Sequence, residues 1–200
     1  WMAHAEKFPG LTTPDDSYHG VTYAKEFGKA AYITKATAQL MRDFGSTPAP
    51  ISSWIMGMHL ESLGVRMERH CANAQKVAEW LAADPRVSWV SFPGLETDKY
   101  HALAEKYMPN GTCGVISFGV PGGREKVSAF LDHLKMVSIA THVADARSCT
   151  LYPAGTTHRQ LTEEQLEEAG VGIDLVRLSC GIENTADIIA DLDQALAAVQ

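Results

Sequence analysis

Hydrophobic positions along the chain change their spacing from one segment to the next, which indicates alternating helices and strands. The strongest signal is an apolar stripe at intervals of three and four residues, which predicts a long helix over residues 51–83. The stripe consists of Leu63, Met67, Cys71, Ala74, Val77 and Leu81. Polar residues such as Asn73 fill the opposite, solvated side of the predicted helix. Gly57 and Gly64 weaken its first half, so the pattern allows a kink there.

Shorter patterns predict the remaining elements. Alternating or short apolar runs bounded by turn residues predict five strands. These cover residues 86–92, 114–120, 137–141, 150–152 and 175–180. Helices are predicted over residues 25–43 and 97–107, after Glu125, from the capping box Thr162–Gln165 to Gly170, and after the N-cap Asn184. The order of these elements predicts an α/β sandwich, in which helices pack on one small mixed or antiparallel sheet, preceded by an irregular arm over residues 1–20.

Composition narrows the classes of partner. The 200 residues carry a net charge of −7 and have a pI near 5.6, which argues against nucleic acid or an acidic membrane surface as partner. No apolar run approaches the roughly 20 residues that a membrane span needs. The cysteines, Cys71, Cys113, Cys149 and Cys180, are widely spaced in apolar surroundings. We therefore expect free thiols in a cytoplasmic protein rather than disulfides or a zinc site.

Arg177 is the residue that points most directly to chemistry. It lies between Val176 and Leu178 in a strand-like apolar run, where a guanidinium is costly without an anionic partner. The planar, permanently charged fork of arginine suits a carboxylate. That carboxylate belongs either to an Asp or Glu of the protein, which is the commoner case, or to a substrate. The residues around Arg177 leave both alternatives open.

Several segments in a fixed order resemble the PLP-dependent enzymes of Cys/Met metabolism, and most closely their acetylhomoserine branch. The segments are Pro14–Gly20, Leu60–His70, Asn73–Ala78, Phe92–Leu95, Pro153–His158 and Val176–Glu183. Together they extend over nearly the whole chain. The resemblance implies the C-terminal domain of a fold-type I PLP enzyme. It also implies that residues 51–200 form a substrate-side domain, and that residues 1–50 are an arm and connecting helix from the PLP-binding domain.

The resemblance implies roles for three substrate-binding residues. Arg177 matches the arginine that holds the α-carboxylate of the substrate. Ser148 matches a position whose backbone and hydroxyl approach the same carboxylate, with a plain loop serine as the alternative. Thr157 matches a threonine near the substrate, with a structural threonine about equally expected, and His158 is interpreted as structural. Tyr18 and His19, in the arm, are weaker candidates for the border of the site.

The Schiff-base lysine of the family is expected to be missing from this chain. That lysine follows Ser-x-Thr, and none of the nine lysines here does so. Lys35 is the nearest approach, but Tyr32 stands where the serine belongs, and we interpret Lys35 as a solvated helix lysine. The chain is thus expected to be the C-terminal part of a longer enzyme, inactive alone. It is expected to contain no catalytic residue, no cofactor-binding residue and no metal ligand.

The reaction implied by the resemblance is a γ-replacement. The longer enzyme would bind PLP, replace the acetyl group of O-acetylhomoserine with sulfide or a thiol, and give homocysteine or methionine. A homo-oligomer, in the family a tetramer, and the enzyme's own PLP-binding domain are the implied protein partners. Two alternatives remain: a cystathionine γ-synthase or a methionine or cystathionine γ-lyase of the same family, or a non-catalytic binding or oligomerisation module.

Overall fold

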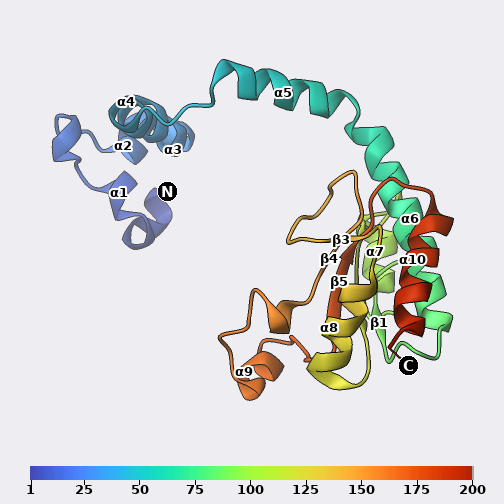
Figure 1. Ribbon diagram of the computed structural model, residues 1–200. Helices are drawn as coiled ribbons and strands as arrows, with labels where there is room; N and C mark the ends of the chain where they lie inside the picture. Colours follow the sequence, from blue (N-terminus) through green and yellow to red (C-terminus); the bar gives the residue numbers. More distant parts are fainter. Residues whose placement is uncertain (200) are drawn as a thin grey trace. The chain divides into compact units, whose positions relative to one another are not determined.

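The computed structural model describes residues 1–199, which form two compact units, residues 1–59 and residues 60–199 (Figure 1). The larger unit contains one five-stranded sheet with the order β1-β2-β5-β4-β3. Its strands are β1 (Val90–Ser91), β2 (Val115–Gly119), β3 (Ser138–Ile139), β4 (Cys149–Leu151) and β5 (Leu175–Ser179). All neighbours pair antiparallel except β3 and β4, which run parallel. The mixed sheet with packed helices confirms the predicted α/β fold class.

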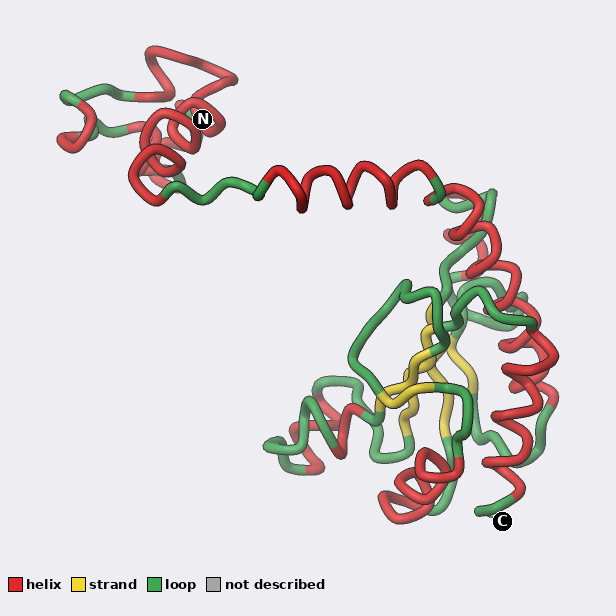
Figure 2. Tube along the Cα trace, turned by 45° about the horizontal axis from the view of Figure 1, so that its top comes forward, coloured by secondary structure: helices red, strands yellow, loops and turns green. Residues whose placement is uncertain are grey.

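One face of this sheet is covered by three helices, α6 (Leu63–Ala83), α8 (Gly123–His133) and α10 (Thr185–Ala197) (Figures 1 and 2). The strands contribute large apolar side chains to this core, and each of the following is fully buried: Ile116, Phe118, Val176 and Leu178. The helices contribute Val77, Leu81, Phe130, Ile188 and Leu192, also fully buried. Burial of this apolar area is the main stabilising contribution to the unit.

The central strand β5 alternates between the two faces of the sheet. Because successive side chains of a strand point to opposite sides, Val176 and Leu178 face the helices while Arg177 and Ser179 lie on the second face. On that face the register places Ser117 of β2 and Leu151 of β4 on either side of Arg177. The fold thus brings the arginine that the sequence singled out to the middle of the sheet, away from the helical core.

The predicted elements of the larger unit are present, mostly with shorter bounds. The predicted strand over residues 86–92 is reduced to β1, and the helix over residues 97–107 begins only at His101, as α7 (His101–Tyr107). The capping box of Thr162 and Gln165 is confirmed at the start of α9 (Glu163–Glu168). Asn184 is confirmed as the N-cap of α10, where its side chain accepts a hydrogen bond from the amide of Ala186 at 3.1 Å.

The predicted single helix over residues 51–83 is two helices, α5 (Pro50–Glu61) and α6, with Ser62 between them at φ −100° and ψ 3°. The expectation that Asn73 is solvated was wrong. Its side chain is fully buried because it bonds the chain that follows β5. The sequence pattern marks only apolar faces, so a buried amide with several partners does not stand out in it.

Residues 2–44 of the smaller unit form short helical turns. They are η1 (Met2–Lys7), α1 (Pro9–Thr12), η2 (Asp16–Tyr18), α2 (Tyr23–Phe27), η3 (Gly28–Ala30), α3 (Ala31–Lys35), η4 (Ala36–Met41) and α4 (Arg42–Phe44). The predicted helix over residues 25–43 is therefore interrupted, first at Gly28 with φ 53°. A small core of Leu11, Tyr23, Ala24 and Ala31 holds the turns together.

Lys35 is not the solvated lysine that its position in a helical pattern suggested. Its ammonium donates to the carboxylate of Asp15 at 2.7 Å and to the carbonyl oxygen of Gly10 at 2.8 Å. The ammonium thereby ties the N-terminal turns to α3. The hydrogen bond from Lys35, helped by a second one from Ser17, lowers the pKa of Asp15 to about 2.

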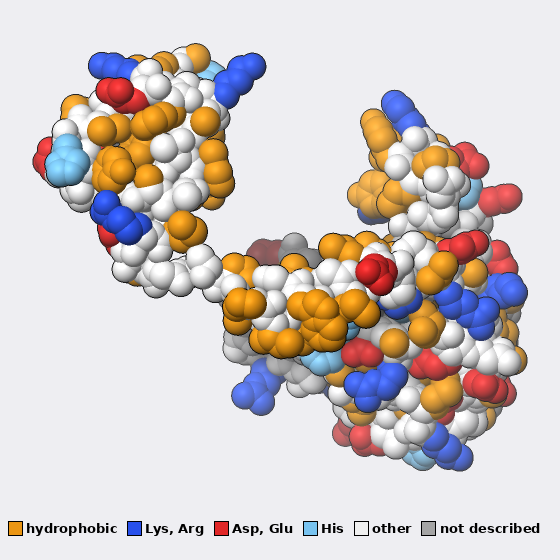
Figure 3. Space-filling model, turned by 90° about the horizontal axis from the view of Figure 1, so that it is seen from above, with side chains coloured by type: hydrophobic (Ala, Val, Ile, Leu, Met, Phe, Trp, Pro, Cys, Tyr) orange, Lys and Arg blue, Asp and Glu red, His pale blue; other side chains and the backbone are white. Residues whose placement is uncertain are grey.

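Helix α5 is apolar on every side. Its mean hydropathy is high, none of its residues is buried, and hydrophobic side chains gather along it in Figure 3. The exposed ones are Ile51, Trp54, Ile55, Met56, Met58 and Leu60. A helix that is hydrophobic all round is typical of a protein interior, so α5 has the composition of a helix that other polypeptide covers. No helix of residues 1–199 is both long and apolar enough to cross a membrane.

Candidate functional site

The guanidinium of Arg177 lies on the second face of the sheet and makes one hydrogen bond with the other residues of the 1–199 range. Its Nη2 donates to the carbonyl oxygen of Thr141, just after β3, at 2.9 Å. Its Nε atom is buried and has no hydrogen-bond partner. Within residues 1–199, no Asp or Glu forms an ion pair with this guanidinium. The alternative of a protein carboxylate partner is therefore not what the fold provides. A buried donor without a partner is costly, and a carboxylate ligand would satisfy it.

The chain between β3 and β4, residues 141–148, forms the border of the site and is called the 141–148 segment below. It lies on the side of the strands away from α6 and α10 (Figure 1). It is tied to β5 and to the residues that follow β5, because the Ala144 amide donates to Ser179 Oγ at 3.1 Å and the Ile182 amide donates to the Ala146 carbonyl at 2.9 Å. Ala144 has φ 56°, which is a left-handed conformation that alanine rarely adopts.

Ser148 ends this segment and is fully buried. Its hydroxyl donates to Glu183 Oε2 at 3.0 Å and accepts from the Gly181 amide at 2.9 Å, while its own amide donates to Glu183 Oε1 at 2.6 Å. Every donor and acceptor of the Ser148 side chain thus has a partner in the chain that follows β5. Glu183 is the last residue of the segment Val176–Glu183, which resembles the family, but the sequence alone did not indicate a role for it.

Helix α6 anchors the chain that follows β5 through four successive carbonyl groups. His70 Nδ1 donates to the Cys180 carbonyl at 2.6 Å, so Nδ1 carries a proton. Asn73 donates to the carbonyls of Gly181 and Glu183, each at 2.9 Å. Arg69 donates to the Glu183 carbonyl at 2.9 Å and, more weakly, to the preceding one at 3.4 Å. These hydrogen bonds explain why two polar side chains of α6, His70 and Asn73, are buried.

The other predicted site residues make no hydrogen bond to this network within residues 1–199. Thr157 is exposed, two residues past the 3-10 helix η5 (Pro153–Gly155), and its hydroxyl lies 2.9 Å from Nδ1 of His158. His158 is partly buried, and its amide donates to the Pro153 carbonyl at 2.9 Å. Tyr18 and His19 belong to the smaller unit, where Tyr18 stacks on Tyr23 with ring centroids 5.9 Å apart.

Lys35, which comes nearest to the lysine motif of the family, has its ammonium committed to Asp15 and Gly10. By contrast, the free guanidinium donors of Arg177 fit the carboxylate of an amino acid.

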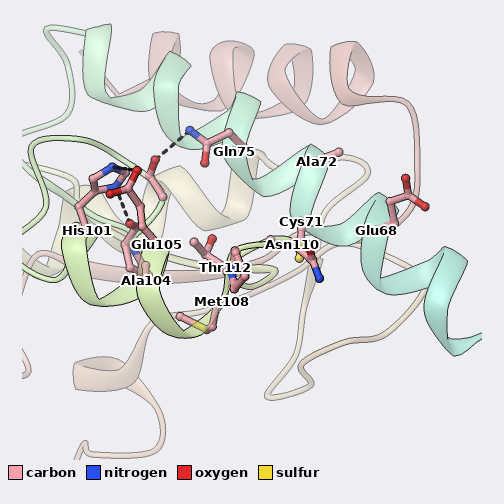
Figure 4. Close-up of a pocket in the computed structure, with 14 residues that line it drawn as sticks. Glu68, Cys71, Ala72, Gln75, His101, Ala104, Glu105, Met108, Asn110 and Thr112 are labelled. Atoms are coloured by element: carbon pink, nitrogen blue, oxygen red, sulfur yellow. Dashed lines mark hydrogen bonds and ion pairs between the residues drawn. The ribbon is translucent and has the colours of Figure 1, made fainter.

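A pocket lies between α6 and α7 in the larger unit (Figure 4). Its polar lining includes Glu68, Gln75, His101 and Glu105, together with Cys71. Most of these groups already have partners: Gln75 bonds Glu79 and the Gly94 carbonyl, and His101 lies against the Pro93 carbonyl and Glu105. Because few free polar groups converge in it, this pocket is a weak candidate for a ligand site.

Comparison with known proteins shows the family of this chain. The family model for Cys/Met metabolism PLP-dependent enzymes matches residues 15–197, and the chain belongs to that family. It is 44% identical to O-acetyl-L-homoserine sulfhydrylase of Leptospira meyeri over 95% of this chain and 45% of the relative. It is 42% identical to homocysteine synthase of Schizosaccharomyces pombe over 98% of this chain and 46% of the relative.

A solved structure extends the likeness to three dimensions. The crystal structure of a putative O-acetylhomoserine (thiol)-lyase from Campylobacter jejuni, which contains N'-pyridoxyl-lysine-5'-monophosphate, superposes with a TM-score of 0.87. It is 36% identical and is matched over 96% of this chain and 45% of its own. The chain thus spans about 45% of the length of the relatives it matches. Fold-type I architecture and the PLP-dependent family, both implied by the sequence motifs, are confirmed.

Proposed function

We propose that this chain supplies the substrate-carboxylate site of a PLP-dependent transferase. That enzyme replaces the acetyl group of O-acetylhomoserine with sulfide or a thiol and yields homocysteine or methionine. The observation that carries the proposal is the guanidinium of Arg177, whose buried Nε has no partner and whose Nη2 is fixed by Thr141. The names of the sulfhydrylase and homocysteine synthase relatives support the choice of reaction.

In this proposal Arg177 does the work of orientation. A guanidinium that binds both oxygens of a carboxylate fixes the position and the rotation of the amino acid, which lowers the entropic part of the barrier to reaction. Ser148 and Thr157 are proposed as the neighbouring substrate-side residues. PLP, when bound by the complete enzyme, supplies the electron sink for the carbon chemistry, and we assign no residue of this chain to its attachment.

The proposed domain organisation and protein partners follow from the same proposal. Residues 51–200 are proposed as the substrate-side domain, residues 1–50 as an arm and connecting helix, and the PLP-binding part of the enzyme together with further copies of the subunit as protein partners. The exposed apolar residues of α5 support a covering polypeptide. Four free cysteines support a reducing compartment such as the cytoplasm. Light scattering of the full-length enzyme tests the assembly, and a monomer would contradict it.

The substitution Arg177→Lys in the full-length enzyme tests the carboxylate site. A single ammonium cannot reproduce the paired contact, so the KM for O-acetylhomoserine should rise by roughly tenfold to a hundredfold, with little change in the KM for sulfide. Arg159→Lys, at an exposed position, is the matched control and should leave both values unchanged. An unchanged KM for O-acetylhomoserine in Arg177→Lys contradicts the proposal.

The choice of reaction is tested separately in the unmodified full-length enzyme. Release of acetate from O-acetylhomoserine in the presence of sulfide identifies the transferase. Release of ammonia from methionine or cystathionine instead identifies a γ-lyase of the same family. A full-length protein that binds no PLP and releases neither product would leave a non-catalytic module.

A further inference from the structure

Glu183 is engaged through both of its carboxylate oxygens by one residue, Ser148. Oε1 accepts the Ser148 amide at 2.6 Å, and Oε2 accepts the Ser148 hydroxyl at 3.0 Å. The hydroxyl in turn accepts the Gly181 amide at 2.9 Å. Both oxygens of the carboxylate therefore act as hydrogen-bond acceptors. The side chain of Glu183 therefore links the residues after β5 to the end of the 141–148 segment.

The same segment carries the group that holds Arg177. The Thr141 carbonyl, which accepts from Arg177 Nη2, lies at one end of the 141–148 segment, and Ser148 lies at the other. Two further bonds tie the middle of the segment to β5 and to the residues after it: the Ala144 amide donates to Ser179 Oγ, and the Ile182 amide donates to the Ala146 carbonyl. Ser148 and the carbonyl that accepts from the guanidinium are therefore the two ends of one short loop that is bonded along its length.

The residues that carry Glu183 are held firmly by α6. The backbone of residues 180–183 is bonded to α6 through His70, Asn73 and Arg69, and Asn73 also accepts from the Thr185 hydroxyl at 2.6 Å. Glu183 therefore acts from a fixed frame on a loop that has no regular secondary structure. A long side chain that bridges a helix-anchored turn and a loop is well placed to determine the position of that loop.

We propose that Glu183 is a positioning residue for the carboxylate site, fixing the 141–148 segment and, through Thr141, the guanidinium of Arg177. The inference rests on the proposed function, since it assigns Glu183 a role in binding the same substrate carboxylate. Glu183 itself touches no substrate in this scheme. Its effect passes through Ser148 and the segment between Ser148 and Thr141.

The decisive variants are Glu183→Gln and Glu183→Asp in the full-length enzyme with PLP. Glutamine keeps the size of the side chain but presents an amide donor where Oε2 accepts the Ser148 hydroxyl. Aspartate keeps the charge but is one methylene too short to engage both donors. Each should raise the KM for O-acetylhomoserine by about tenfold while the KM for sulfide and the cofactor absorbance stay unchanged. Glu167→Gln, at an exposed position of α9, is the matched control and should change nothing.

A double-mutant cycle with Arg177→Lys separates positioning from stability. If Glu183 acts through Arg177, then Glu183→Gln adds less than about twofold to the KM once Arg177 is already replaced. A merely structural role would lower the melting temperature and the active fraction, leaving the KM of the folded enzyme unchanged. Amide hydrogen exchange gives a readout besides activity, because the Ser148 and Gly181 amides should exchange faster in Glu183→Gln.

The two proposals fail in different ways. If Arg177→Lys raises the KM and both Glu183 variants leave it within about twofold of the parent, the positioning role is wrong and the carboxylate site stands. If Arg177→Lys itself leaves the KM unchanged, both the carboxylate site and the positioning role are overturned. Additive effects of Glu183→Gln and Arg177→Lys would likewise overturn the connection between the two residues.

Discussion

The guanidinium of Arg177 donates to the carbonyl oxygen of Thr141 at 2.9 Å, joining the central strand of the sheet to a loop 36 residues earlier in the chain. This bond leaves the buried Nε without a partner. One N–H is thus used for orientation while another remains available for an anion. In the proposed function, this arrangement keeps an arginine that has no carboxylate partner within residues 1–199 in place for the substrate.

Ala144→Gly is expected to stabilise the protein. Ala144 has φ 56°, and the left-handed region costs an L-residue about 1–2 kcal/mol, whereas glycine adopts it without strain. After the greater flexibility of glycine in the unfolded chain is subtracted, the free energy of unfolding should rise by about 0.5–1 kcal/mol, measured by urea denaturation. Ala146→Gly in the same segment, where φ is not positive, serves as the control and should destabilise. Equal effects of the two substitutions would contradict this account.

Asp191 is predicted to contribute stability that depends on pH. Its carboxylate is buried, which by itself raises its pKa. Hydrogen bonds from the amides of Val137, Lys135 and Met136 outweigh burial and lower the pKa below its usual value. Because the pKa is lower in the folded state, the contribution is fully present above pH ~4 and is lost as the pH falls through the folded-state value.

Asp191→Asn should therefore reduce the free energy of unfolding at pH 7 by about 1–3 kcal/mol, because asparagine offers one acceptor oxygen to three amides. Urea denaturation at several pH values measures the effect, and the difference from the parent should narrow below pH ~4. Asp132→Asn, at an exposed position of α8, is the control. A difference that stays constant from pH 7 to pH 3 would refute the role of the ionised carboxylate.

Cys180 is expected to resist alkylation in the folded protein. Burial raises the pKa of its thiol to about 12, with a smaller contribution from the charge of Glu183, so almost no thiolate is present at pH 8. Mass spectrometry after brief treatment with iodoacetamide should find Cys113, which is partly exposed, labelled before Cys180. In urea the two cysteines should be labelled alike. Equal labelling of both in the native protein would show that the site opens more readily than the structure implies.

Local signals in the sequence were sufficient for most of the fold. The capping box at Thr162 and the N-cap at Asn184 depend on residues two or three positions apart, and both are present as predicted. The apolar run over residues 175–180 produced β5. The break at Ser62 was not located, because glycines at 57 and 64 weaken a helix without specifying where it ends.

Only part of the proposed carboxylate site could be predicted from local signals in the sequence. Arg177 stood out because a charge in an apolar strand is unusual. Thr141, Asn73 and Glu183 did not, because their contacts join residues 35 to 114 positions apart. Lys35 was misread for the same reason, since its carboxylate partner, Asp15, comes 20 residues earlier.

The sequence by itself determined the α/β class, the order of the elements, the family and the arginine at the centre of the site, because each follows from local periodicity, local capping or motifs read along the chain. Only the tertiary structure decided which groups satisfy one another around that arginine. Hydrogen bonds between distant segments depend on how the sheet, α6 and the 141–148 segment pack together. No local pattern specifies that packing. For that reason the hydrogen-bond partner of Arg177 and the contacts of Glu183 are seen only in the folded structure.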